Sequence, residues 1–403
     1  MKNHSHDRSS AKRLLVIIPD RITDILVKGE YQPRYYNPGG LFDEVHILST
    51  TADNPDLNAL QRTVGDAKLH VWHHPDDLSL IGTRPGIFRR LRLRRWARGG
   101  VDLARRIKPD LIRCHGADWN VYLASRIKGE LGVPYVMSLH INPDVNPVRR
   151  YLKDNLTRAE AWHNSFYDSL EHEGLTNADL VMPVYKPILP YLVRHGVERV
   201  RVCYNVLNSN FLSEKTDYSL NSPPRIVSVG RLLDAKDPSN IIRAVHSLPG
   251  VELLIVGDGP KRPELERLTS SLGVADRVRF APAIENDELC RMLPGFDLFA
   301  VHSEYWELNK SVLEALLTGL PIVINRRQGE PVPELADADF VKLVDNTEQS
   351  YRDAIAGLLS DDRAREKLGR RAYAHAQDNW APAKTEAVYS EIYRGMLDRA
   401  RPH

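Results

Sequence analysis

Residues 227–245 read VSVGRLLDAKDPSNIIRAV, and this stretch decides the fold. It begins as a short apolar strand, turns at Gly230 and continues as an amphipathic helical pattern. Arg231 and Lys236 lie in the turn. Two cations at the carboxyl end of a strand suit a diphosphate, whose negative charge grows as it leaves. Surface salt bridges are the commoner reason for such a pair, so its spacing alone assigns no ligand.

The same alternation of short apolar runs and longer helical patterns extends to both sides of this stretch. It is typical of βαβ units around parallel sheets. A polar stretch at 208–224, rich in Ser, Asn, Asp and Pro, predicts a linker. We therefore expect an α/β protein with two doubly wound, Rossmann-like domains, 1–208 and 209–381, facing across a cleft, and a helix at about 382–403 that returns to the first. The predicted strands begin at Leu14, Glu44, Leu69, Leu111, Tyr135, Asp179, Val200, Arg225, Val251, Val278, Asp297, Pro321 and Phe340.

Composition excludes several classes of function. Among 403 residues, 55 Lys and Arg balance 53 Asp and Glu, and this argues against a dedicated nucleic-acid binder. The cysteines Cys114, Cys203 and Cys290 are scattered and form no disulfide framework, which favours a reducing cytoplasm. No apolar run approaches the roughly 18–20 residues of a membrane span, so any membrane contact is expected to be peripheral.

Two further motifs follow the opening stretch. The run LLIVGDGP closes a strand with Gly257 and Gly259 but lacks the third glycine of a dinucleotide fingerprint. A tight turn explains these glycines as well as ligand contact does. Downstream, Asn309, Lys310 and Ser311 precede the helical pattern VLEALLTG, and the free amides of a helix N-terminus make an anion site.

Two carboxylates accompany that helix. Glu314 lies about one turn inside it, where it can accept hydrogen bonds from a sugar diol or simply interact with the helix dipole. Glu307 lies on the loop before the helix and can reach the same ligand, or remain a solvated loop carboxylate.

The motifs GRLLDAK, LIVGDGP and VLEALLTGLP, in this order and spacing, resemble the C-terminal domain of retaining GT-B glycosyltransferases of family 4. In the first half VPYVMSLH, ADLVMPV and VRVCYNV resemble the family's strands more weakly. The resemblance covers roughly four-fifths of the chain.

The resemblance implies roles for individual residues. Arg231 and Lys236 would hold the donor diphosphate, Glu314 the donor ribose and Glu307 the transferred sugar. The family's first glutamate position falls on Trp306, so Glu307 is one residue out of register; Glu304 is a less favoured substitute. Gly257, Asn309, Lys310 and Ser311 complete the expected donor site.

The N-terminal domain is expected to complete the catalytic site. The resemblance places His140 near the reacting anomeric carbon and His115 along the cleft. Asp20, Arg21 and Lys28 either line the acceptor side or belong to a plain surface loop. The family's early Gly-Gly loop has no counterpart there, because Gly39 and Gly40 come late.

An arginine-rich stretch is the remaining signal. Residues 78–101 contain no Asp or Glu, and Arg84–Arg98 interleaves arginines with bulky apolar residues. This favours contact with an anionic membrane surface; a solvated basic helix packed on its domain and a nucleic-acid arm are the alternatives. The residues assigned to membrane contact are Arg89, Arg90, Arg92, Arg94, Arg95 and Trp96.

We therefore predict a retaining glycosyltransferase, cytoplasmic or peripheral on the inner face of the cytoplasmic membrane. It would move a sugar from a nucleotide-diphosphate sugar to a saccharide or lipid-linked glycan acceptor. His140, Glu307, Arg231 and Lys236 would be catalytic, and no metal or other cofactor is expected. The alternatives are another GT-B enzyme, such as a nucleotide-sugar epimerase or a sugar phosphorylase, and a catalytically inactive GT-B binding module.

Overall fold

The computed structural model describes residues 11–27, 32–75, 86–117, 119–143, 157–208, 210–305, 307–327, 332–336 and 339–399. Three residues used in the sequence predictions lie outside the described residues: Lys28, Arg84 and Trp306.

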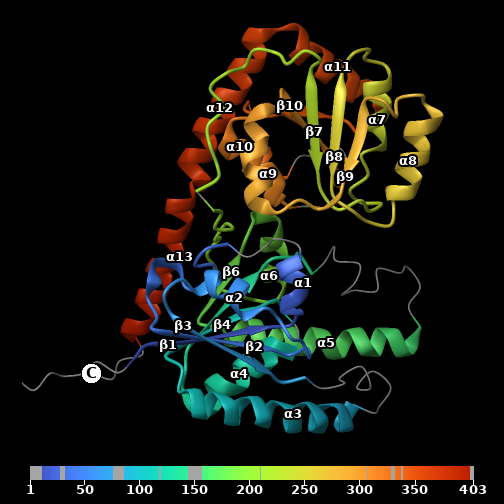
Figure 1. Cartoon of the computed structure of the whole chain (residues 1–403). Coiled ribbons are helices and arrows are strands. Elements are labelled where there is room, and N and C mark those ends of the chain that lie inside the picture. The colour runs from blue at the N-terminus through green and yellow to red at the C-terminus, as the bar shows by residue number, and fades with distance from the viewer. Residues whose placement is uncertain are drawn as a thin grey trace, which may run out of the picture.

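A six-stranded parallel sheet forms the core of the first half (Figure 1). Its strand order, β3-β2-β1-β4-β5-β6, is the doubly wound order in which β1 and β4 flank the point where the winding reverses. Both faces of β1 are buried: Leu15 and Ile17 pack into one apolar core and Leu14 and Val16 into another. The strands are β1 Arg13–Ile18, β2 Glu44–Ser49, β3 Lys68–His73, β4 Leu111–His115, β5 Tyr135–Leu139 and β6 Leu180–Pro183.

Helices cover both faces of this sheet. They are α1 Ile22–Val27, α2 Leu57–Gln61, α3 Gly86–Ile107, α4 Trp119–Leu131, α5 Arg158–Asn177 and α6 Leu189–Arg194. The strand expected at Val200 is wrong, because the segment forms only an isolated bridge with Val181 before it leaves toward the second half.

The second half repeats the same plan. Its strand order is β12-β11-β10-β7-β8-β9, so β7 and β10 flank the reversal as β1 and β4 do in the first sheet. Its strands are β7 Arg225–Val229, β8 Glu252–Val256, β9 Val278–Ala281, β10 Leu298–Val301, β11 Ile322–Asn325 and β12 Lys342–Val344. Its helices are α7 Ser239–His246, α8 Arg262–Ser271, α9 Asn286–Met292, α10 Lys310–Thr318, α11 Glu348–Ser360 and α12 Asp362–Trp380. These two sheets with their helices are the predicted GT-B architecture.

The last helix, α13 Pro382–Arg399, continues from α12 and runs back along the first half (Figure 1). The Tyr389 hydroxyl donates a hydrogen bond to the Cys203 carbonyl at 3.0 Å. The Tyr393 ring meets Phe42 edge-on, with 5.9 Å between centroids. The first half therefore includes residues from both ends of the chain.

The arginine-rich stretch forms α3, whose inner face is mostly apolar but includes one arginine. Arg89 and Trp96 are both buried, so the membrane contact predicted for these two residues is corrected. The Arg89 guanidinium lies 3.9 Å from the centre of the Trp162 ring of α5. The indole of Trp96 donates to the His74 carbonyl at 3.1 Å. Both side chains serve the packing of α3 on its own half.

Across the part of the chain that the structure describes, no helix is long and apolar enough to span a bilayer.

Candidate active site

The wall of the site in the second half begins where β7 ends. Gly230 follows β7, and the turn after β8 packs directly on it. A Cβ on Gly257 (φ +138°) would lie 2.1 Å from the Gly230 carbonyl oxygen, and one on Gly259 (φ +157°) 2.2 Å from the Leu232 carbonyl oxygen. Backbone packing therefore accounts for both glycines. They hold the turn that carries Arg231 and Lys236.

A small cavity lies at the reversal point of the second sheet, beside the amino end of α10. The Ser311 hydroxyl donates to the Val229 carbonyl at 3.1 Å and fixes this end of the helix against β7. Asn309 precedes the helix, and its buried Oδ1 has no hydrogen-bond partner among the described residues. The free amides at the amino end of the helix make this a polar site suited to an anion, and Asn309 Oδ1 can accept a hydrogen bond from a ligand. The lining residues are Ser228, Val229, Gly230, Leu232, Lys236, Pro238, Ile255, Val301, His302, Asn309 and Ser311.

Lys236 and Glu307 form an ion pair in the site. The Lys236 ammonium donates to Glu307 Oε1 at 2.6 Å, and both side chains are largely buried. Glu307 thus reaches Lys236 although it stands one residue out of the family register. Glu304 lies 2.9 Å from Nε2 of His302, a residue of the cavity wall.

Tyr185, which follows β6 in the first half, connects the Lys236–Glu307 ion pair to that half. The Tyr185 hydroxyl lies 3.4 Å from Glu307 Oε2 and donates to the His140 carbonyl at 2.9 Å. Burial, followed by the charge of Glu307, raises the pKa of Tyr185 well above its ordinary value. The phenol therefore stays protonated. His140, Tyr185, Glu307 and Lys236 form one connected group that crosses between the halves.

Arg231 is exposed on the turn that also carries Lys236. Within the described ranges its guanidinium has neither an ion pair nor a hydrogen-bond partner. The cation is therefore available to a ligand, in contrast to Lys236.

Glu314 lies deeper, inside α10, and is buried. Its Oε1 accepts a hydrogen bond from the Asn286 amide at 2.6 Å and lies 4.0 Å from Lys310. Asn286 in turn accepts from Gln32 of the first half at 2.6 Å. Next to it, Asp287 binds Arg62 of the first half through two bonds of 2.8 and 3.1 Å. The candidate ribose carboxylate is thus linked to the contact between the halves.

The histidines of the first half stack on each other. His115 ends β4, His140 follows β5, and their rings are 5.1 Å apart and parallel within 3°. Below them the buried Arg113 donates to the Tyr35 carbonyl at 2.8 Å. Burial, together with the charge of Arg113, lowers the pKa of His140 to about 3 and that of His115 well below its ordinary value. Both rings are neutral near pH 7.

Two of the residues predicted for the acceptor side, Asp20 and Arg21, lie on the loop between β1 and α1. Asp20 is exposed, and Arg21 lies 3.8 Å from the buried carboxylate of Asp53. The Gly39 amide donates to Glu386 of α13 at 2.9 Å, so the Gly-Gly pair belongs to the α13 contact rather than to the site.

Sequence reasoning missed three residues in or beside the candidate site. Tyr185, Asn286 and Arg113 belong to no motif. Only the position of Tyr185, just after a strand whose carboxyl end faces the cleft, pointed toward the site.

Two family profiles together match most of the chain. Residues 213–375 match the profile described as "Glycosyl transferases group 1", and residues 40–206 match the "Glycosyl transferase 4-like domain". The chain belongs to the group 1 glycosyltransferases. This family assignment agrees with the motifs on β7, β8 and α10.

Curated relatives match over a part of their length. The lipopolysaccharide core biosynthesis glycosyltransferase LpsE of Rhizobium meliloti is 31% identical over 178 residues, which are 43% of this chain and 52% of LpsE. A D-inositol 3-phosphate glycosyltransferase of Mycolicibacterium smegmatis is 35% identical over 193 residues, 46% of this chain and 44% of the relative. The chain therefore spans about half the length of these glycosyltransferases.

A solved structure agrees with the fold over nearly the whole chain. Anabaena HepE, in complex with UDP-glucose, superposes with a TM-score of 0.69 at 17% identity, covering 95% of this chain and 99% of HepE. At that identity the likeness shows the GT-B fold.

Proposed function

We propose that this glycosyltransferase takes a nucleotide-diphosphate sugar as donor and transfers its sugar, with retention, to a saccharide or lipid-linked glycan. The observation that carries the proposal is the meeting of Glu307 and Lys236 with Tyr185 across the two halves. An enzyme that joins two sugars needs a donor side and an acceptor side within reach of one anomeric carbon. The names of LpsE and of the inositol phosphate relative support a glycan or phosphorylated polyol acceptor.

The donor would bind along the second half. Arg231, Lys236 and the amino end of α10 would hold the diphosphate, and Glu314 would accept hydrogen bonds from the ribose diol. Binding would draw Lys236 from Glu307 toward the phosphates. That change would free the Glu307 carboxylate for the hydroxyls of the transferred sugar. The complex of HepE with UDP-glucose supports a donor of this class.

The reaction we propose is a front-face substitution. The bond between the anomeric carbon and the phosphate oxygen breaks, and the acceptor oxygen bonds to the same face. The acceptor proton passes to an oxygen of the departing diphosphate. Arg231 and Lys236 stabilise the charge that develops there, and we infer that these cations make a catalytic metal unnecessary. His140, which is neutral, would act by hydrogen bonding to the sugar rather than as an acid.

A panel of nucleotide sugars tests this function. The donor is identified by its thermal stabilisation of the protein, which follows from binding to the folded state alone. Transfer to glycan acceptors is then followed by mass spectrometry, and the anomeric configuration of the product by NMR. An isomerised donor would favour the epimerase alternative, and phosphate-dependent cleavage would favour the phosphorylase.

Matched variants connect the result to the site. Lys236→Ala and Glu314→Gln are expected to lose donor stabilisation and at least about 100-fold in transfer rate. The controls change exposed residues of the same type, Lys342→Ala and Glu288→Gln, and should behave as the wild type. Equal loss in a variant and its control would contradict the assignment, and a folded chain that binds no nucleotide sugar would favour the inactive binding module.

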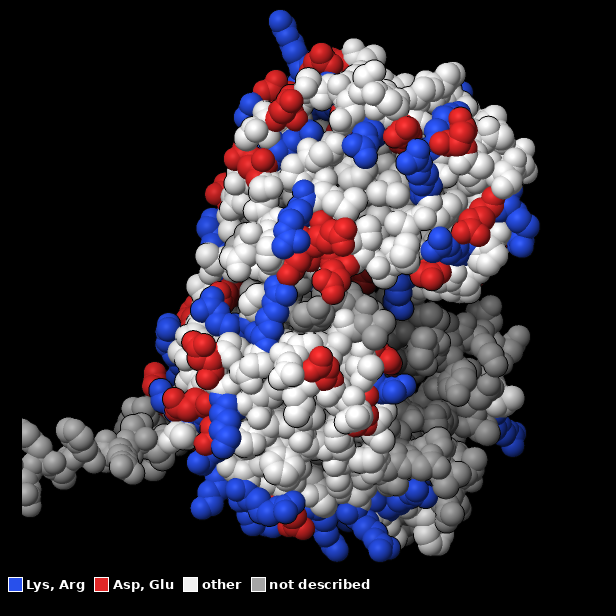
Figure 2. Space-filling model, viewed as in Figure 1, with Lys and Arg blue, Asp and Glu red and all other residues white. Residues whose placement is uncertain are grey.

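We further propose that the enzyme docks peripherally on an anionic membrane surface through α3. Lys and Arg side chains line the lower edge of the molecule over this helix in Figure 2. Arg90, Arg94 and Arg95 are exposed. The large apolar side chains Phe88 and Leu91 are also exposed, by 56% and 55%. Basic and bulky apolar side chains on one exposed surface suit a bilayer interface, at about 1 kcal/mol for each cation.

Liposome flotation tests the docking. The triple variant Arg90→Glu, Arg94→Glu and Arg95→Glu is expected to lose binding to vesicles with 30% anionic lipid, while the wild type binds them and not neutral vesicles. The control carries the same charge reversal on the second half, at the exposed residues Lys342, Arg363 and Lys367. Wild-type binding that ignores both lipid charge and the α3 variant would refute the docking.

A further inference from the structure

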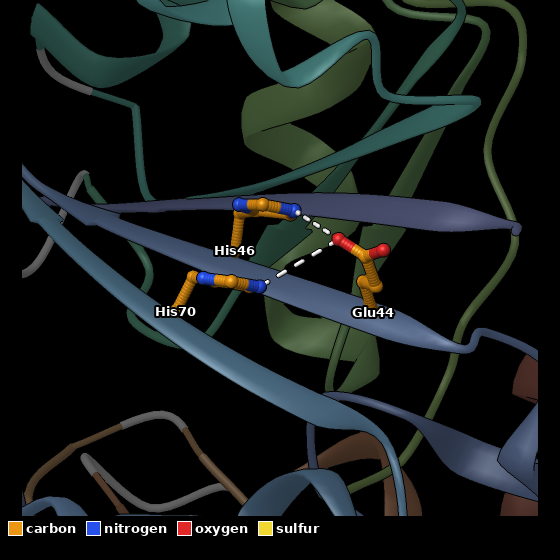
Figure 3. A group of neighbouring side chains, drawn as sticks. All are labelled: Glu44, His46 and His70. Carbon is orange, nitrogen blue, oxygen red and sulfur yellow. Dashed lines mark ion pairs between the residues drawn. The ribbon is translucent and has the colours of Figure 1, made fainter.

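Three side chains of types that commonly bind metal ions lie close together on the first sheet, outside the candidate active site. Glu44 and His46 are two residues apart on β2 and so project from the same face. His70 on β3 is paired directly with His46 in the strand register. Figure 3 shows both imidazole rings pointing toward the Glu44 carboxylate. All three come from the first three residues of their strands, whereas the active site lies at the carboxyl ends.

The distances approach those of a coordination sphere. Glu44 Oε2 lies 3.4 Å from His46 Nε2 and 3.6 Å from His70 Nε2. Tetrahedral zinc, with bonds of about 2.0–2.2 Å to nitrogen and oxygen, sets its ligand atoms about 3.3–3.5 Å apart. The two rings are stacked, 4.4 Å between centroids and within 5° of parallel. A tilt of the rings toward each other would bring the two nitrogens to the same spacing.

Two of the three ligand atoms, the histidine nitrogens, also lack a hydrogen bond within the described part of the chain. His46 is only 5% exposed. Nε2 of His46 and Nε2 of His70 are buried atoms for which the described residues provide no hydrogen bond of normal length. Buried polar atoms without partners are rare in native proteins, and an unfilled ion site is one cause.

Two neighbours compete with a metal ion. Arg13 Nε on β1 lies 3.5 Å from Glu44 Oε2. The Trp72 indole donates to His46 Nδ1 at 3.1 Å, which puts the ring proton on Nε2. A metal on Nε2 needs this proton on Nδ1, because a ligating histidine donates through its other nitrogen. Binding therefore breaks the hydrogen bond from Trp72.

We propose that Glu44, His46 and His70 bind one divalent ion of the zinc class, with water in the fourth position. Two imidazoles and a carboxylate are a ligand set that zinc accepts. Because β3 is the edge strand of its sheet, the ion would cross-link this edge strand to its neighbour β2. The proposed ion site is independent of the proposed glycosyl transfer.

Calorimetric titration of the chelator-treated full chain with zinc chloride tests the site, with thermal unfolding as a second readout. His4 and His6 of the same chain also bind zinc in principle, so both are changed to Ala throughout. We expect one ion per chain at micromolar affinity or tighter, with a rise in the unfolding temperature. His70→Ala should weaken binding at least 100-fold. His73→Ala, an exposed histidine on the opposite face of β3, should leave it unchanged.

Two further variants sharpen the result. Glu44→Gln repeats the test with a nearly isosteric change, should His70→Ala fail to fold. Trp72→Phe should tighten binding several-fold, because it removes the donor that competes for His46. Equal binding by the His70→Ala and His73→Ala variants overturns the proposal. Binding only at millimolar zinc, an adventitious ion only, overturns it as well.

Discussion

Replacing Gly257 by Ala separates the two explanations for this glycine, a tight backbone contact or a direct ligand contact. The added Cβ would lie 2.1 Å from the Gly230 carbonyl oxygen, and the backbone stands at φ +138°, which side chains rarely adopt. An unfavourable backbone region costs about 1–3 kcal/mol, and overpacking about 1–3 kcal/mol more. We therefore expect Gly257→Ala to lower the free energy of unfolding by about 2–6 kcal/mol.

Gly250→Ala is the matched control. This glycine also has a positive φ, +79°, but a Cβ there meets no atom within 4 Å. Only the cost of the unfavourable backbone conformation remains, and it lowers the free energy of unfolding by about 1–2 kcal/mol. Thermal unfolding resolves the difference, since 1 kcal/mol moves the midpoint by about 2–4 °C in a domain of this size.

The affinity for a nucleoside diphosphate is measured on the same variants, below their unfolding temperatures. The contact with Gly230 holds the turn that carries Arg231, so Gly257→Ala should also weaken this binding, and Gly250→Ala should not. If the two variants unfold at the same temperature, the argument from backbone contact is refuted. Loss of binding without loss of stability would instead support direct ligand contact.

Three further results are expected. Tyr185→Phe removes the hydroxyl beside Glu307 together with its bond to the His140 carbonyl but keeps the ring, so it should lower kcat/KM for transfer about 10-fold and cost about 1–3 kcal/mol of stability; an unchanged kcat/KM, measured at steady state well below the unfolding temperature, would argue for a structural role alone. Asp287→Ala removes the two bonds from Arg62 and should open the halves, seen as a larger radius of gyration in X-ray scattering without ligand; an unchanged radius would contradict a role in closure. His140 has a folded pKa of about 3 against 6.5 unfolded. The unfolded state therefore binds a proton that the folded state does not, so stability is present above pH 6.5 and falls below it; His140→Gln should flatten this fall in urea unfolding between pH 7.5 and 5, and an identical slope would refute it.

The second half was largely predictable because its chemistry is local in sequence. The stretch from Val227 to Val245 contains a strand, a turn and a helix, so pattern and spacing alone place Arg231 and Lys236 at a strand end. Glu307 lies beside Lys236 although it stands one residue out of register, because a loop can absorb one residue while the helix after it fixes Glu314.

The contacts across the halves were not predictable. Tyr185 and Asn286 are remote from their partners in sequence and carry no motif, so only folding brings them to the site. The arginine-rich helix shows another limit. Composition marked it as basic, but a mixed periodicity did not reveal that Arg89 and Trp96 face inward.

The return of α13 to the first half has a consequence for building chimeras. Because the chain passes between the halves twice, near residue 208 and again between α12 and α13, a donor half from another enzyme cannot be joined at a single point. A graft has to enter after the first passage and stop before Pro382. Otherwise the foreign sequence replaces Tyr389 and Tyr393, and the recipient loses part of its own core.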